Sequence, residues 1–499
     1  MVTFALSLVA LIAGYLLYGK FIDRVFGPDD RQTPAVAHPD GVDYIVLPSW
    51  KIFMIQFLNI AGTGPIFGAI MGMWFGPSAY LWIVFGCIFA GAVHDYFSGM
   101  LSMRHDGAGL PELVGDYLGQ TTKKVMLVFS VLLLVMVGVV FVYSPAIIME
   151  SIWGTRMFWI CVIFLYYIVA TLLPIDKIIG KIYPLFAFSL LFMALALMIG
   201  LFVKWPSLPE VWDGLDNLGA KEWGRNEPIF PALFITIACG AISGFHATQS
   251  PLMARCVKSE KMGRPIFYGA MITEGIVALI WATVSSYFFF YGGWKEVVSP
   301  EVVAQFEQSG KTLNQFFDAP TVVKDVCNGW LGVFGGVLAL LGVVAAPITS
   351  GDTAFRSARL IIADFLGMEQ RTMSKRLMIC IPMFAASILL LVWQMENPDG
   401  FNTIWQYFGW ANQTLAVFTL WTITVYLVQE KKPFIITLIP ALFMTTVTST
   451  FLFISKTAFG LDSTLSYTLG CIVFVAALVW FFAWYTKYKK NASTGLKDY

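Results

Sequence analysis

Apolar runs of about 20 residues recur along the whole chain, separated by short polar segments. Each run is long enough to cross a bilayer as an α-helix. Solid apolar blocks differ from the alternating segments of about ten residues that mark an outer-membrane barrel. The pattern predicts an all-α polytopic membrane protein with thirteen spans, near residues 2–19, 51–76, 78–102, 125–148, 157–175, 179–203, 229–253, 265–292, 329–354, 376–395, 402–428, 433–455 and 464–486.

Two of these runs are interrupted at membrane depth by small and polar residues. Span 2 contains NIAGTGPIFGAI, Asn59 to Ile70, and span 7 contains CGAISGFHATQSP, Cys239 to Pro251. The two breaks are five helices apart, so a second copy that begins at span 7 crosses the membrane in the opposite sense. Broken helices at matching positions in two inverted halves indicate the binding site of a secondary transporter. The alternative is that both breaks are ordinary Gly or Pro kinks, which are common in membrane helices.

The breaks divide the chain into a repeated core and additional helices. We predict an additional helix and a cytoplasmic loop over 1–50, a first repeat of spans 2–6 over 51–203, a second repeat of spans 7–11 with two long outer loops over 204–428, and two additional helices with a cytoplasmic tail over 429–499. The halves share no convincing residue-by-residue identity. This 5+5 inverted repeat with two discontinuous helices is therefore inferred from the breaks and the topology alone.

Composition and charge define the environment and the orientation of the spans. The chain is 58% hydrophobic and 13% charged, whereas a soluble domain has about 25% charged residues, so soluble folds are excluded. Loops after odd-numbered spans, with the C-terminal tail, hold 24 of the 32 Lys and Arg residues. This bias predicts an outside N-terminus and a cytoplasmic C-terminus. The first span lacks a basic segment before it and a cleavage site, so we expect a retained helix rather than a signal peptide.

The breaks supply candidate substrate ligands. Unwound backbone is tolerated in a membrane where it lines a polar cavity, and there its N–H groups and half-helix N-termini attract an anionic group. Glycines let a solute approach the backbone closely. The alternative for each hydroxyl is a bond to its own helix, and the amides of span 11 could bond other helices instead. The candidates are Asn59, Gly62, Thr63, Gly64, Ser243, Gly244, His246 and Gln249, with Asn412 and Gln413 from span 11.

Two further spans carry candidates for ion or proton coupling. Ionisable residues inside a membrane are functional candidates by default, and hydroxyl and carboxylate oxygens suit a small cation or a proton. The alternatives are a structural His–Asp pair in span 3 and, in span 9, an ion pair between the aspartate and Arg356, four residues later. The candidates are His94 and Asp95 in span 3 and Thr349, Ser350 and Asp352 in span 9.

Signals for other chemistry are weak. Glu274 in span 8 is a lone intramembrane carboxylate, open to the same functional and structural interpretations. The seven cysteines lack metal-like spacing, and the four histidines are too scattered to define a metal site. No cofactor is expected, and the only candidate cation site lies at Thr349 and Ser350. Because GxSxG, HExxH and P-loop signatures are absent from the sequence, we predict that the protein is not an enzyme.

The interrupted and polar segments together resemble the carbon starvation protein A family of bacterial inner-membrane transporters. The matching runs are NIAGTGPIFGAI, FGPSAYLWI, GAVHDY, SGFHATQSP, ITSGDTAFRSAR and FGWANQ, which spread from span 2 to span 11. The chain is expected to be a short member without the additional helices of longer ones. The resemblance implies the five-plus-five inverted-repeat core of the leucine-transporter type. In that core span 9 lies against the first broken helix, and Thr349 and Ser350 match the hydroxyls beside which related symporters place sodium or a replacing charge.

The resemblance also implies a function. Family substrates are peptides and pyruvate, and the implied energy source is a proton gradient. We expect an importer of small nutrients that works by alternating access, with a small-molecule substrate, a coupling proton or sodium ion and the lipid bilayer as partners, and no nucleic acid. The alternatives are a sodium-coupled symporter of the amino-acid type, a passive channel and a nutrient-binding sensor without transport.

Overall fold

The computed structural model describes residues 1–41, 43–150, 152–172, 175–224, 227–370, 372–397 and 400–494. Over these ranges the protein is all-helical and contains no β-strand. The membrane-spanning elements follow the predicted order. Span 1 consists of α1 (Val2–Ala13), η1 (Gly14–Tyr18) and α2 (Gly19–Phe26), span 2 of α4 (Ser49–Ile60), η2 (Gly64–Gly68), α5 (Ala69–Gly72) and η3 (Met73–Phe75), and span 3 of α6 (Ser78–Leu81), η4 (Trp82–Gly91) and α7 (Ala92–Arg104). Spans 4, 5 and 6 are the helices α9 (Gln120–Glu150), α10 (Arg156–Leu172) and α11 (Ile175–Lys204), span 7 consists of α13 (Ile229–Thr236) and α14 (Gly244–Ala254), and span 8 of η7 (Arg264–Tyr268) and α15 (Gly269–Phe289). Spans 9 to 13 are the helices α19 (Ala319–Phe365), α20 (Met373–Glu396), α21 (Gly400–Gln429), α22 (Ile435–Ile454) and α23 (Ser463–Thr494).

Short helices connect the spans. They are α3 (Pro34–Ala37), α8 (Leu110–Leu118), η5 (Val211–Asp213), α12 (Leu218–Trp223), η6 (Glu260–Met262), α16 (Trp294–Val297), α17 (Pro300–Ser309) and α18 (Leu313–Phe316). The last three lie in the predicted outer loop between spans 8 and 9.

The described residues contain ten helices that are long and apolar enough to cross a membrane, or eleven if the bent pair in span 2 is counted as one span. The two other predicted spans have a different form. Span 5, Arg156–Leu172, is a shorter apolar helix, and span 7 is divided between α13 and α14. Span 9 extends beyond the predicted 329–354, because the helix continues through polar residues on both sides and leaves helical geometry only at Gly332, where φ is 64°.

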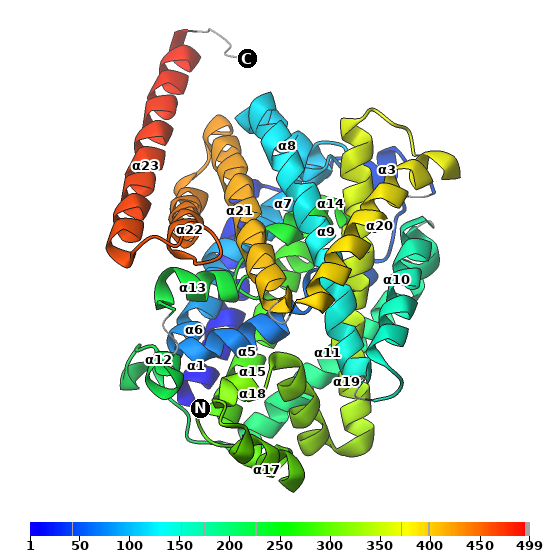
Figure 1. Cartoon of the computed structure of the whole chain (residues 1–499). Helices are drawn as coiled ribbons and strands as arrows, with labels where there is room; N and C mark the ends of the chain where they lie inside the picture. Colours follow the sequence, from blue (N-terminus) through cyan, green and yellow to red (C-terminus); the bar gives the residue numbers. More distant parts are fainter. Residues whose placement is uncertain are drawn as a thin grey trace.

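Met1 and the C-terminal end of α23 lie at opposite ends of the helix bundle (Figure 1). This placement fits an odd number of crossings. The ammonium group of Met1 pairs with Glu210, in the loop after span 6, and the helices α12 and α17 lie near the same end of the bundle (Figure 1). The loops after spans 6 and 8, both predicted to be outside, therefore lie on the N-terminal face.

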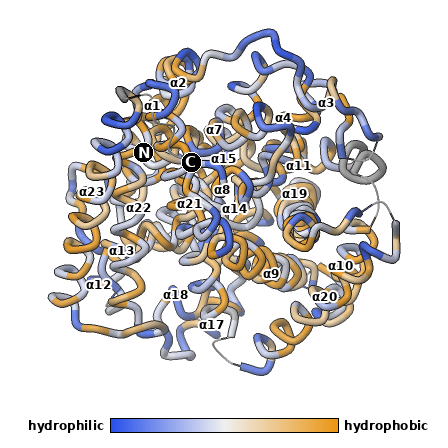
Figure 2. Tube along the Cα trace, turned by 90° about the horizontal axis from the view of Figure 1, so that it is seen from above, coloured by the Kyte–Doolittle hydropathy of each residue, from blue (hydrophilic) through white to orange (hydrophobic). Residues whose placement is uncertain are grey.

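Burial separates the helices of the core from those on the surface of the bundle. In span 8, 89% of the apolar window is buried, whereas in span 13 only 17% is buried. Exposed side chains of α23 include Ile472, Val475 and Trp480. Figure 2 shows hydrophobic residues on helices at the periphery, α10, α20 and α23 among them. An apolar outer surface of this kind is what a helix bundle presents to lipid.

Candidate functional site

The break in span 2 separates α4 from η2 by a bend of 56°. Helix α4 ends at Ile60, and the carbonyl of Thr63 begins the next helical segment by accepting bonds from Ile66 and Phe67. Pro65 stands in the first turn of that segment, where its missing N–H costs no helical hydrogen bond. The sequence thus ends one half-helix and begins another, as its glycines and proline predict.

Several polar atoms in this break lack protein partners. Both amide atoms of Asn59, the hydroxyl of Thr63 and the side-chain oxygen of Gln56 are buried and have no hydrogen-bond partner among the described residues. The amide nitrogen of Gln56 donates to Ser250, in α14, over 3.3 Å. Buried polar groups without partners are rare in native proteins and call for an explanation such as a bound group.

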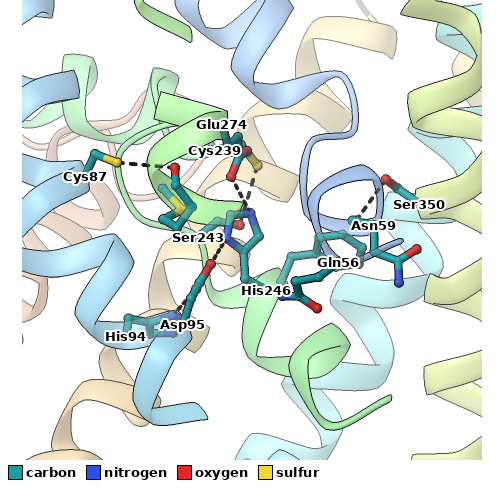
Figure 3. A network of polar contacts seen from close by, with 12 residues as sticks. Gln56, Asn59, Cys87, His94, Asp95, Cys239, Ser243, His246, Glu274 and Ser350 are labelled. Carbon is teal, nitrogen blue, oxygen red and sulfur yellow. Dashed lines mark hydrogen bonds and ion pairs between the residues drawn. The ribbon is translucent and has the colours of Figure 1, made fainter. Parts of the chain in front are cut away.

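Span 9 is connected to this break by Ser350. Its hydroxyl lies 3.1 Å from the carbonyl oxygen of Leu58 and 2.9 Å from that of Asn59, to which it donates (Figure 3). The hydroxyl of Thr349 instead donates to its own helix, at Ala345 and Ala346. Span 9 therefore lies against the first broken helix, as the family resemblance implies. The Thr349 hydroxyl, by contrast, bonds its own helix rather than span 2.

The break in span 7 is held from span 11. Gly240, with φ of 94°, lies in the unwound segment between α13 and α14. The side-chain oxygen of Asn412 accepts from the N–H of Phe245 over 2.7 Å and from the hydroxyl of Ser243 over 3.1 Å. Asn412 thereby acts as an N-terminal cap supplied by another helix.

Two further candidates near this break are partly committed to protein contacts. The amide nitrogen of Gln413 donates to the carbonyl of Phe234 in α13 over 2.7 Å. That of Gln249 donates to the hydroxyl of Thr248 over 2.8 Å, while its side-chain oxygen has no partner among the described residues.

The two breaks touch each other through glycine. A Cβ atom added at Gly64 would lie 2.3 Å from the Cβ of Cys239, and one added at Gly62 would lie 2.6 Å from the ring of Phe141. At Gly244 it would lie 2.3 Å from the carbonyl oxygen of Asn412. These glycines permit close packing of the two broken spans with spans 4 and 11. The space beside each is occupied by protein in this conformation.

A chain of buried ionisable residues crosses spans 3, 7 and 8. Nδ1 of His94 lies 2.8 Å from Asp95, whose second oxygen lies 2.9 Å from Nδ1 of His246. Nε2 of His246 lies 3.4 Å from Glu274, and all four side chains are fully buried. Figure 3 shows this chain on one side of His246, with Gln56 and Asn59 on the other. The expected His94–Asp95 pair is thus part of a larger cluster that joins the span 7 break to span 8.

A second buried cluster surrounds Asp352 in span 9. One carboxylate oxygen accepts from the hydroxyl of Tyr183, in span 6, over 2.7 Å. The other has no hydrogen-bond partner among the described residues. Arg356, also buried, donates to the carbonyl of Ala170 over 2.6 Å. Tyr183 carried no signal in the sequence, because a tyrosine in an apolar span is more often a packing residue.

A cavity of about 700 Å³ opens on the N-terminal face of the bundle. It lies between the η2–η3 half of span 2, helix α13 of span 7, and spans 11 to 13. Met71 and Trp74 line it from span 2, Thr236 from span 7 and Trp405 from span 11, and Lys456 lines it from the loop before span 13. This vestibule, on the predicted outer face, is lined by none of the residues Asn59 to Gly64 or Cys239 to Ser243.

The chain matches the family model of carbon starvation protein CstA over residues 1–157, 142–325 and 312–451. It belongs to the CstA family. The CstA-family chain is 26% identical to peptide transporter CstA of Escherichia coli K12, over 85% of this chain and 76% of the relative. It is 24% identical to the pyruvate/proton symporter BtsT of the same organism, over 88% and 79%. An uncharacterized membrane protein of Haemophilus influenzae is 47% identical over 58% of this chain and 91% of its own length.

Solved structures with the same fold are also transporters. A manganese transporter of Eremococcus coleocola superposes with a TM-score of 0.56 at 12% identity, over 90% of this chain and 98% of that one. A Na⁺-coupled sialic acid symporter superposes with a TM-score of 0.53 at 13% identity, over 96% of each chain. This CstA-family protein therefore has the leucine-transporter type of fold, with two discontinuous helices.

Proposed function

We propose that this protein is a secondary active importer of small carboxylate-bearing nutrients, peptides or pyruvate-like acids, driven by protons. It would work by alternating access in a bacterial inner membrane, with its N-terminus outside and its C-terminus in the cytoplasm. Membership of the CstA family supports transport, and the names of the peptide and pyruvate relatives support the substrate classes. A transporter of this kind is not an enzyme and needs no cofactor.

The observation that carries the proposal is the set of unpartnered polar atoms at the span 2 break. Asn59 has two, Thr63 has one, and Gln249 offers another from span 7. Leaving such groups buried without partners costs about 1–3 kcal/mol each. A solute with a carboxylate and an amide or ammonium group would satisfy them. The substrate would reach this position from the outer vestibule.

Coupling is assigned to Asp352 and Ser350. Asp352 keeps a free carboxylate oxygen in a buried site, where a negative charge is expensive and a proton would relieve it. Ser350 is two residues away on the same helix and bonds the carbonyls that end the first half of span 2. A proton on Asp352 would thus change the position of span 9 against the break where the substrate binds.

Sodium is the second candidate for the coupling ion. The hydroxyl of Ser350 and the carbonyl oxygens of Leu58 and Asn59 lie within hydrogen-bonding distance of one another across the two helices. Oxygen ligands of this kind suit hard cations. In this conformation the Ser350 hydrogen occupies those carbonyls, and Thr349 contributes no oxygen to them. These contacts favour the proton.

Uptake by the full-length protein in proteoliposomes tests the proposal. Labelled pyruvate and a labelled dipeptide are offered under an inward pH gradient, an inward sodium gradient and neither. We expect accumulation of at least one solute under the pH gradient alone. Accumulation under the sodium gradient alone would mean that sodium, and not the proton, is the coupling ion. Binding of a solute without accumulation under either gradient would favour a nutrient sensor and contradict the proposed transport.

A further inference from the structure

Three potential metal-binding side chains converge beside the break in span 7. Cys239 lies in the unwound segment, His246 in the first turn of α14 and Glu274 on α15. The thiol sulfur, an imidazole nitrogen and a carboxylate oxygen all lie within 4.8 Å of one another. Each of the three residues is buried, with no more than 2% of its surface exposed. Figure 3 shows Cys239 and Glu274 near the same edge of the His246 ring.

Three atoms at this point lack hydrogen-bond partners among the described residues: Nε2 of His246 and both carboxylate oxygens of Glu274. The thiol of Cys239 donates to the hydroxyl of Ser243 over 3.5 Å. The imidazole nitrogen and the nearer oxygen are 3.4 Å apart, a separation at which their hydrogen bond is weak. A buried carboxylate without hydrogen bonds is costly unless a cation is close to it. The arrangement therefore points to a ligand placed between the three side chains.

The second nitrogen of His246 is already engaged. Nδ1 lies 2.9 Å from an oxygen of Asp95, and the other oxygen of Asp95 lies 2.8 Å from His94. Because a carboxylate accepts, Nδ1 carries a hydrogen, so Nε2 is the nitrogen that would present its lone pair to a bound metal. Histidines that bind metals commonly donate their other N–H to a carboxylate, which fixes the orientation of the ring. Asp95 would have this orienting role.

The donor set selects a class of metal. Thiolate and imidazole donors bind Zn²⁺ and similar borderline transition metals, whereas Mg²⁺ and Ca²⁺ prefer oxygen ligands throughout. We propose that Cys239, His246 and Glu274 bind a single divalent transition metal of the Zn²⁺ class that fixes the span 7 break to span 8. Three protein ligands leave one coordination position open for water or a solute. This site is distinct from Asp352 and from the polar atoms of Asn59. Metal binding at it can be measured without a transport assay.

Co²⁺ absorption and Zn²⁺ binding by the purified full-length protein test this proposal. Co²⁺ reports thiolate ligation through a charge-transfer band in the near ultraviolet, and Zn²⁺ is titrated against a chromophoric chelator. We expect one metal per chain and the thiolate band in the unsubstituted protein. Cys239→Ser should remove the band, and Glu274→Gln should weaken Zn²⁺ binding but keep it. Asp95→Asn should weaken Zn²⁺ binding by about 10–100-fold.

Cys327→Ser is the matched control, since Cys327 is also fully buried but lies at the start of α19. It should keep both the band and the Zn²⁺ affinity. A full-length protein that binds no metal, or a band that survives in Cys239→Ser, would overturn the proposal. If Cys239→Ser does not fold, the spectrum of the unsubstituted protein together with the Cys327→Ser control still decides whether a thiolate binds the metal. A finding that the protein binds no metal would not contradict the proposed transport function, because metal binding and gradient-driven uptake are measured in separate assays.

Discussion

The two broken helices look alike in sequence but are stabilised differently. In span 2 the side chains of Asn59 and Thr63 have no hydrogen-bond partner among the described residues, and span 9 bonds the backbone of this break through Ser350. In span 7 the break is capped by Asn412, and ionisable residues of two other helices surround it. The span 2 break has unpartnered amide and hydroxyl atoms, whereas at span 7 the N-terminus of α14 is capped and the unpartnered atoms include Nε2 of His246 and both oxygens of Glu274. Under the proposed function, this difference favours substrate binding at span 2 and anchoring at span 7.

Replacing Asn59, in the span 2 break, and Asn412, which caps the span 7 break from span 11, should separate these roles most clearly. Asn59→Leu removes polar atoms that have no protein partner, so uptake should fall to background while the free energy of unfolding stays within about 1 kcal/mol of the original value. Asn412→Leu, as the matched variant, should instead destabilise the protein because two donors lose their acceptor. Uptake assays and thermal unfolding of both proteins provide the measurement. Normal uptake by Asn59→Leu would contradict the binding role of span 2.

The contact between the breaks can be tested through Gly64. A methyl group there would overlap the Cβ of Cys239 at 2.3 Å. Gly64→Ala should therefore destabilise the protein by about 1–3 kcal/mol, the usual cost of overpacking a core. The double substitution Gly64→Ala with Cys239→Gly should recover part of that loss. If the two changes are additive in thermal unfolding, the breaks do not touch as described.

The cap on span 7 has a smaller expected effect. Asn412→Ala leaves the N–H of Phe245 and the hydroxyl of Ser243 without their acceptor. The free energy of unfolding should fall by about 0.5–2 kcal/mol, as for other helix caps. Thr414→Ala on the same helix is the control, since its hydroxyl donates to the backbone of that helix at Trp410. Equal stability of the two variants in thermal unfolding would show that Asn412 is not a cap.

The smallest effect is expected at Ser350. Ser350→Ala removes one hydroxyl that bonds the end of α4, so stability should fall by about 1 kcal/mol. Thr349→Ser should change it less, because the serine hydroxyl can keep the local bond to its own helix. Chemical denaturation of the two variants gives the comparison. An Ser350→Ala protein as stable as Thr349→Ser would mean that span 9 is not held to the break through this bond.

The sequence was sufficient to predict the elements and their interruptions. Long apolar runs predicted the spans, and Gly62, Gly64 and Pro65 predicted the break in span 2, because helix propensity and membrane crossing depend on local composition. The family resemblance, rather than local composition, implied that span 9 lies beside this break, and Ser350 bonds the carbonyls there. The boundaries of the two repeats remain predictions.

The partners of the polar residues could not be predicted in this way. Asp95 contacts His246 across 151 positions of the chain, and Tyr183 contacts Asp352 across 169. These distances depend on how helices pack, which hydropathy and spacing do not specify. Glu274 was visible only as a lone carboxylate, and Cys239 only as one of several apolar-span cysteines. Their convergence on His246 is a property of the tertiary structure.

The central claim is that span 2 binds the solute while Asp352 couples its movement to protons. Asp352→Asn in proteoliposomes tests it directly, by comparing accumulation under a pH gradient with solute exchange at equal pH. The account predicts that accumulation is lost while exchange persists, and that the exposed control Asp364→Asn on the same helix keeps both. Loss of both activities in a folded Asp352→Asn protein, or full accumulation by it, would contradict the account.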